Sequence, residues 1–210
     1  MVDKFRIIVI IIGAGMIITF SLYSFGSYFS SSSPKTGTKA EPVNNSGSNV
    51  DLTRNKSIQM IAYENREKPE NFYLIQFPSN ANVLHGNKSG SYTAKLSHGI
   101  FSVDLVDIPD NSNVELYLLT KVKPALESSI KNFNQISFNQ LSIGGNRAWD
   151  LTYAWKNSTA EMESIKTFVE GSDEAAAITY SGLRQQFVDN QNINSTVIQP
   201  VLKSFHWIVK

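Results

Sequence analysis

Apolar and polar residues alternate along several short stretches from residue 58 onward, which is the pattern of half-buried β-strands. In "IFSVDLVDIP", Phe101, Val103 and Leu105 share one face and Ser102 and Asp104 share the other. The strand predicted in "AWDLTYAW" has a face made entirely of large apolar residues. These are Trp149, Leu151, Tyr153 and Trp155.

Turn residues divide these strands. "NFYLIQFP" ends at Pro78, and "QISFNQLSI" changes parity near Asn139-Gln140, which predicts a β-bulge. Gly144-Gly145-Asn146 and Gly171-Ser172-Asp173 each predict a tight hairpin turn. The chain is therefore expected to form an antiparallel sheet.

Two helical patterns interrupt the strands. Ser112 and Glu115 fit a capping box, and Pro124 is expected to kink or restart the helix that follows. The apolar positions of this helix are Leu116, Leu119, Leu126, Ile130 and Phe133. A second apolar stripe, near the end of the chain, has Pro200 in its first turn. Strands followed by helices packed on them predict an α+β fold.

The N-terminal stretch has a different pattern, because no residue from Ile7 to Pro34 is charged. Residues 7–29 would form a helix about 35 Å long, enough to cross a hydrocarbon core of about 30 Å. A cleaved signal peptide is the alternative, with Ser24-Phe25-Gly26 as a passable cleavage site. We expect a retained transmembrane anchor over 1–29, with the C-terminal part outside the cytoplasm.

A polar segment rich in Ser, Asn and Gly follows, and it predicts a flexible linker over 30–57. The remaining residues, 58–210, are enough for one domain with a sizeable core. Five Asn residues begin N-x-[ST] sequons and are possible glycosylation sites. They are Asn44, Asn55, Asn87, Asn157 and Asn194.

Composition excludes several functions. The formal net charge is +1 and basic residues are scattered, so no nucleic-acid-binding surface is indicated. The chain has no cysteine, which excludes disulfides, thiolate metal sites and cysteine nucleophiles.

Four stretches resemble the PsbP-like family, which includes the C-terminal domain of the extrinsic photosystem II protein PsbP. They are "YENREKPENFYLIQFPSNANV", "ISFNQLSIGGNRAWDLTYAW", "AAAITYSG" and "VIQPVLKSFHWI". The resemblance covers about 58–209. It implies an α/β/α sandwich with a central, mainly antiparallel sheet, and a largely non-enzymatic role in binding other proteins, without implying photosynthesis.

Candidate chemistry is sparse, and no catalytic or cofactor-binding motif is present. The weak metal-site candidates are His85, His98 and Asp107, which would need to meet in space. Trp155, near the end of its strand, is a candidate for an exposed binding surface. No cofactor is expected.

The preferred interpretation is a membrane-anchored, extracytoplasmic, non-enzymatic protein-binding domain, an accessory or assembly factor of a membrane or envelope complex. Two alternatives remain open. One is a small-ligand-binding, metal-binding or hydrolase-like protein that uses a cleft, and the other is a structural component of the cell envelope.

Overall fold

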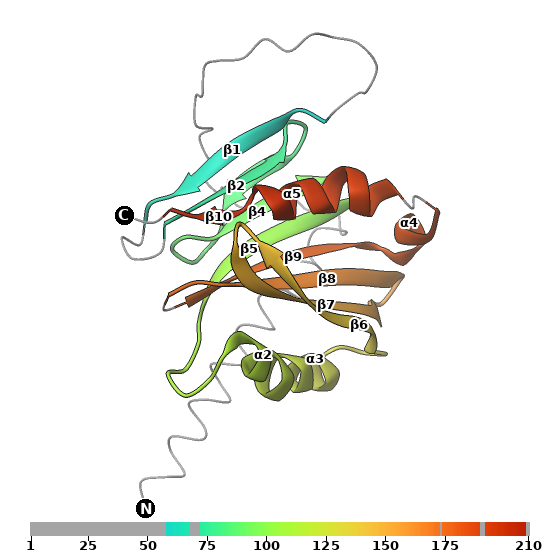
Figure 1. The fold of residues 1–210 in the computed structure, drawn as a ribbon. Helices are drawn as coiled ribbons and strands as arrows, with labels where there is room; N and C mark the ends of the chain where they lie inside the picture. The colour runs from blue at the N-terminus through green and yellow to red at the C-terminus, as the bar shows by residue number, and fades with distance from the viewer. Residues whose placement is uncertain (1–57, 68–71, 173, 190–191, 209–210) are drawn as a thin grey trace, which may run out of the picture.

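The computed structural model describes residues 58–67, 72–172, 174–189 and 192–208, which form a mixed α+β fold (Figure 1). The expected anchor, 1–29, and linker, 30–57, lie outside these residues. Within the described part, no helix is long and apolar enough to span a membrane.

A seven-stranded sheet forms the centre of the fold, and every neighbouring pair in it is antiparallel. Its strands, in spatial order, are β3 (Asn82–His85), β4 (Tyr92–Leu96), β5 (Gly99–Asp107), β9 (Glu174–Leu183), β8 (Glu161–Glu170), β7 (Asn146–Lys156) and β6 (Asn134–Ile143). The expected antiparallel central sheet is confirmed.

A second, three-stranded sheet lies above the first (Figure 1). The sequence predicted the hairpin of its first two strands, but not that they form a separate sheet with a third. It contains β1 (Met60–Asn65), β2 (Tyr73–Pro78) and β10 (His206–Trp207), in the order β1-β2-β10. The end of the described chain therefore returns to pair with one of its first strands. Pro78 closes β2, as expected.

Helical segments cover both faces of the central sheet. One group follows β5 and contains α2 (Val114–Tyr117), the π-helical turn η1 (Leu118–Val122) and α3 (Lys123–Ser129). The other follows β9 and contains α4 (Arg184–Asp189), the π-helical turn η2 (Asn194–Ile198) and α5 (Gln199–Ser204). In Figure 1 the first group lies below the central sheet and α5 lies above it, beside the small sheet.

Each proline-containing helix widens into a π turn just before its proline. Pro124 and Pro200 lie in the first turn of α3 and α5. A proline has no N–H, and in a regular α-helix its ring would clash with the carbonyl four residues earlier. Thr120 and Thr196 occupy that earlier position. Their hydroxyls donate to carbonyls one further turn back, at 2.7 Å to Leu116 and 2.6 Å to Asn192. The expected effect of Pro124 is thus a π turn inside a continuing helix.

The start of α2 differs from the predicted capping box. The N-cap is Asn113 rather than Ser112, and its Oδ1 accepts a hydrogen bond of 2.8 Å from the backbone N–H of Leu116. Asparagine caps helices as well as serine does, so two adjacent candidates could not be separated by residue type.

The bulge predicted at Asn139-Gln140 is wrong in position. The register of β6 against β7 shifts between Gln135 and Ser137, so Ile136 is the extra residue. The hairpin turn after β6 is as predicted, with Gly144 and Gly145 at φ 57° and 82°, values that favour glycine.

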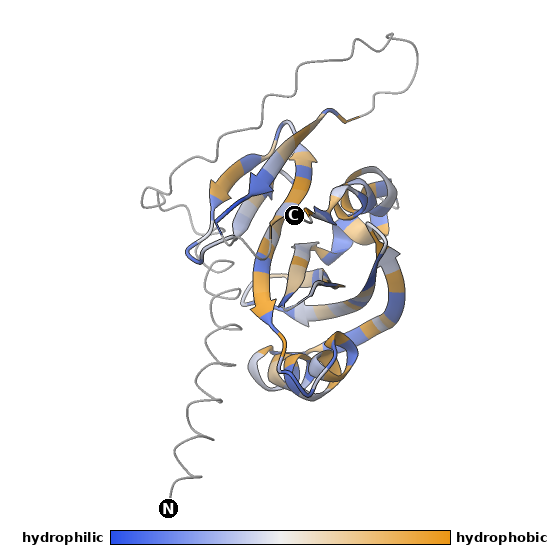
Figure 2. Cartoon of the chain, turned by 60° about the vertical axis from the view of Figure 1, so that its left-hand side comes forward, coloured by the Kyte–Doolittle hydropathy of each residue, from blue (hydrophilic) through white to orange (hydrophobic). Residues whose placement is uncertain are grey.

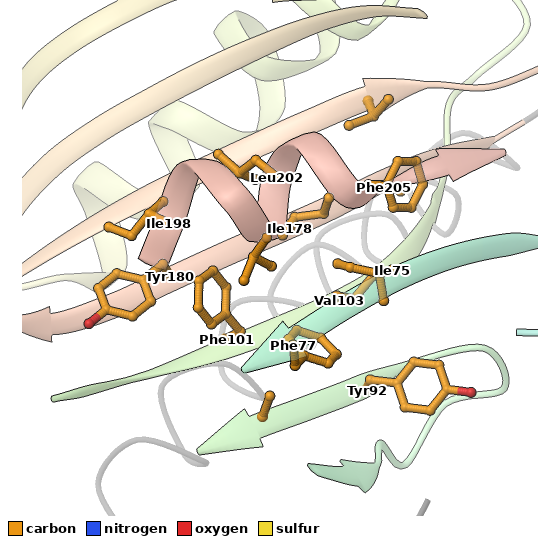
Figure 3. Close-up of a cluster of buried hydrophobic side chains, with 14 of the residues drawn as sticks. Ile75, Phe77, Tyr92, Phe101, Val103, Ile178, Tyr180, Ile198, Leu202 and Phe205 are labelled. Atoms are coloured by element: carbon orange, nitrogen blue, oxygen red, sulfur yellow. The ribbon is translucent and has the colours of Figure 1, made fainter. Parts of the chain in front are cut away.

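The main hydrophobic core lies between the central sheet, the small sheet and α5. Figure 3 shows side chains from β2, β5 and β9 meeting Ile198 and Leu202 in this layer. Two smaller clusters lie on the opposite face, where Val114, Leu118, Leu126 and Ile130 pack on β7 and β8. Apolar and polar bands alternate along the strands in Figure 2, as the sequence predicted.

Candidate binding surfaces

The three weak metal-site candidates are not brought together. His85 pairs with Tyr92 at the start of β4, whereas His98 lies in the turn beyond the end of β4. The two histidines therefore lie at opposite ends of one strand, while Asp107 is the exposed last residue of β5. The described residues contain no group of three His, Asp or Glu side chains placed to hold a metal.

Each of these histidines has its own polar partner. His85 Nδ1 lies 3.9 Å from Glu67 Oε1. The hydroxyl of Tyr180 donates to the carbonyl of His98 at 3.0 Å, and His98 Nδ1 lies 3.0 Å from the same hydroxyl oxygen. Because the Tyr180 hydroxyl already donates its proton to the carbonyl, Nδ1 of a neutral His98 is assigned as the protonated nitrogen, which donates to the hydroxyl oxygen. Burial lowers the pKa of His98.

Trp155, the candidate for an exposed binding surface, is buried. Its side chain is only 7% exposed, and it packs in the cluster that contains Leu126 and Ile130. Its Nε1 donates to Ser164 Oγ at 3.0 Å, so the polar end of the ring is satisfied inside the fold. Trp149, Leu151 and Tyr153 are buried on the same face, as expected.

The sequons differ in exposure. Asn87 and Asn194 are exposed, while Asn157 is half-buried and its Oδ1 accepts backbone hydrogen bonds from Thr159 and Ala160. Asn44 and Asn55 lie outside the described residues.

A polar strip crosses the face of the central sheet on which α2 and α3 pack. Cross-strand pairing places its members on one face, because paired residues of an antiparallel sheet point the same way. The strip consists of Asp104 on β5, Thr179 and Ser181 on β9, and Ser164 and Lys166 on β8. Its two serines lie 2.8 Å apart, Oγ to Oγ.

Lys166 is the central residue of the polar strip. It is buried, its Nζ donates to Thr179 Oγ1 at 3.1 Å, and it lies 5.6 Å from the centre of the Phe168 ring. Burial lowers the pKa of Lys166, and the nearby Asp104 carboxylate opposes that change. Burial also raises the pKa of Asp104, against the attraction of Lys166 and Lys88. The strip thus holds two ionisable groups, both with pKa values shifted toward the neutral form.

No motif in the sequence marks Lys166. The available signal was the alternation in "MESIKTF", where Lys166 shares a face with Met162 and Phe168. A lysine among apolar positions of one strand face is a usable indication of a buried charge.

A second surface feature is apolar and exposed. Leu116 and Leu119, three residues apart on α2 and η1, are 46% and 43% exposed, and we call them the leucine patch. Both were expected to belong to the buried stripe of their helix, and that expectation is wrong. Leu118 is buried instead, at 1% exposure.

The wider π turn explains which leucines are buried. The apolar side chains that face the sheet recur every four residues, at Val114, Leu118, Val122, Leu126 and Ile130. In a regular α-helix of 3.6 residues per turn, such a row would rotate by about 40° at each step and leave the sheet. The π turn compensates for this rotation and turns the leucine patch outward.

Comparison with known proteins identifies the fold. No protein-family model and no curated protein matches the sequence. Among solved structures, cyanobacterial PsbP (CyanoP) from Synechocystis sp. matches with a TM-score of 0.53 at 12% identity, over 78% of this chain and 98% of that one.

Two further structures match similarly. LpqN of Mycobacterium tuberculosis, described as involved in cell envelope biogenesis, has a TM-score of 0.51 at 8% identity, over 71% of this chain and 92% of its own. The Ran-binding protein Mog1p of Saccharomyces cerevisiae has a TM-score of 0.50 at 10% identity, over 71% and 96%. This chain has the PsbP-like fold that its motifs indicated.

Proposed function

We propose that this chain is a membrane-anchored protein-binding domain that acts outside the cytoplasm as an accessory or assembly factor of a membrane or envelope complex. The observation that carries the proposal is the leucine patch. Leu116 and Leu119, each nearly half exposed on one helical segment, offer apolar area that water does not favour.

The surroundings of the leucine patch suit a protein partner. Exposed Glu115 and Lys121 lie on the same helical segment, and Lys123 forms an ion pair of 3.9 Å with Glu127 one turn later. Apolar side chains with a charged rim are the usual composition of a protein–protein interface.

The structural neighbours support this proposal by their described roles. One is a Ran-binding protein and another is involved in cell envelope biogenesis. A fold used for binding a protein and for work at the envelope is compatible with a non-enzymatic accessory role.

The proposed anchor is residues 1–29, and the proposed linker is 30–57. As a coil of 28 residues, the linker would span on the order of 30 Å, which lets the domain reach a partner near the membrane. The mature protein should keep its N-terminal segment and fractionate with membranes. Intact-mass measurement checks this, and a chain that begins at Ser27 would contradict it.

A second candidate function is favoured by the polar strip. A buried lysine beside a carboxylate and several hydroxyls is suited to bind a small polar ligand. This function predicts a ligand whose affinity falls when Lys166 is replaced by methionine and is unaffected by changes at the leucine patch.

The partner-binding proposal is tested by affinity capture from membranes solubilised in mild detergent. Wild type should retain a stoichiometric partner, and the Leu116→Asp/Leu119→Asp variant should lose it by at least about tenfold. Val188→Asp is the matched control, because Val188 is an apolar residue on α4 that is 60% exposed. Equal retention by all three proteins would contradict the proposal.

A further inference from the structure

The strand β6 forms one edge of the central sheet and pairs with β7 on one side only. It is ten residues long and contains neither a charged residue nor a proline. Six of its side chains are exposed: Asn134, Gln135, Ile136, Asn139, Gln140 and Ser142. An edge of this kind leaves backbone N–H and C=O groups open to another strand.

The other sheet edges in the described part of the chain are protected. The opposite edge of the central sheet, β3, has only four residues. In the small sheet, β10 has two residues, and β1 carries Glu64, which forms an ion pair of 2.7 Å with Arg66. Short strands and charges are the usual means of blocking edge pairing, and β6 has only the bulge at Ile136.

We propose that β6 pairs with β6 of a second copy of this chain, in antiparallel orientation, to form a dimer with a continuous central sheet. The regular part of the strand, after the bulge, is 137–143. Two such stretches would form a ladder about 24 Å long.

Charge is the reason to choose a second copy as the occupant. A two-fold antiparallel pair brings each residue near the axis close to its own copy, so a charge in the middle of β6 would meet a like charge. Because β6 is uncharged, that cost is absent. The exposed amides of Asn139 and Gln140, near the middle of the regular part, can also hydrogen-bond across the axis.

The absence of native cysteine allows a direct test. Single cysteines are introduced in the full chain at Asn139, Gln140 and Ser142 on β6, and at exposed Asn82 on β3 as the control. After mild oxidation in detergent, disulfide-linked dimers should form at 139 or 140 at least about tenfold faster than at 142 or 82, because only residues near the axis meet their own copy. Equal rates at all four positions would overturn the proposal.

A charged substitution gives a second, independent readout. Asn139→Lys should weaken self-association in ultracentrifugation of the full chain by about tenfold or more, since two lysines would meet near the axis. Within one copy the new lysine faces Asp150 of β7, so the fold is expected to persist. Asn82→Lys should leave self-association unchanged. An unchanged dimer in Asn139→Lys, or a monomeric wild type, would refute pairing through β6.

Discussion

At the scale of single residues, the polar strip shows how a charge is accommodated inside this fold. The ammonium group of Lys166 donates to a hydroxyl, and Asp104 acts on it as a nearby charge. Lys166 is buried and Asp104 is half-buried, so each loses hydration that their mutual attraction offsets only in part. The charged groups of the polar strip therefore lower the free energy of unfolding of the domain.

The pKa shift of Asp104 predicts how a substitution depends on pH. Since its pKa is higher in the folded than in the unfolded chain, the ionised carboxylate lowers the free energy of unfolding at neutral pH. Asp104→Asn should therefore raise that free energy at pH 7 by less than about 1 kcal/mol. The gain should vanish as pH falls through the folded pKa toward the unfolded value, where both states are protonated.

Urea titrations at pH 7 and near pH 3.5 measure this difference. Asp107→Asn is the control, because Asp107 is an exposed carboxylate at the end of the same strand. A less stable Asp104→Asn protein at pH 7 would show that attraction to Lys166 outweighs the burial of the carboxylate.

Sequence patterns correctly predicted which residues of one strand share a face. They were less successful at predicting which residues of different strands come into contact. The row of Trp149, Leu151 and Tyr153 followed from alternation alone. The burial of Trp155 did not, because it depends on Ser164 from the next strand, which pairing register brings into hydrogen-bond range. The separation of His85 from His98 likewise depends on register.

At the scale of elements, the helical segment after β5 is defined by its π turn. The helix and the break at its proline follow from the sequence pattern, but that pattern predicts one regular helical period through Leu116 and Leu119. The structure keeps a four-residue spacing instead, which the widened turn before Pro124 allows. This local change of period determines that Leu118 is buried and Leu119 is exposed. The hydrophobicity of the residues does not distinguish the two, since both are leucines.

Two adjacent leucines provide the test of this register. Leu118→Ala should lower the free energy of unfolding by about 2–5 kcal/mol, because it opens a cavity under the helix. Leu119→Ala should change it by no more than about 0.5 kcal/mol, because the side chain is 43% exposed. Chemical denaturation of both variants measures the contrast. Equal destabilisation, or a larger effect at Leu119, would show that the helix has the regular period.

At the scale of the whole molecule, the two faces of the central sheet are covered differently. One face packs against α5 and the small sheet, and the other carries the α2–α3 segment (Figure 1). The polar strip lies on this second face. The antiparallel sheet and the PsbP-like fold could be predicted from strand alternation and motifs. The third strand of the small sheet could not, because β10 has two residues and lies far along the chain from its partner β2.

The leucine patch and the β6 edge give the molecule two proposed contacts, one with a partner and one with itself. The described residues hold three hydrophobic clusters within one domain, so both surfaces lie on a well-packed scaffold. Substitutions at either surface should therefore separate binding from folding.

Site-specific photocrosslinking in living cells tests directly whether the leucine patch binds another protein. A photoreactive residue replaces Leu119 in one full-length protein and Val188 in another. We expect a discrete crosslinked adduct with one other protein from position 119 and none from position 188. No adduct from position 119, or the same adducts from both positions, would contradict a protein-binding role for the leucine patch.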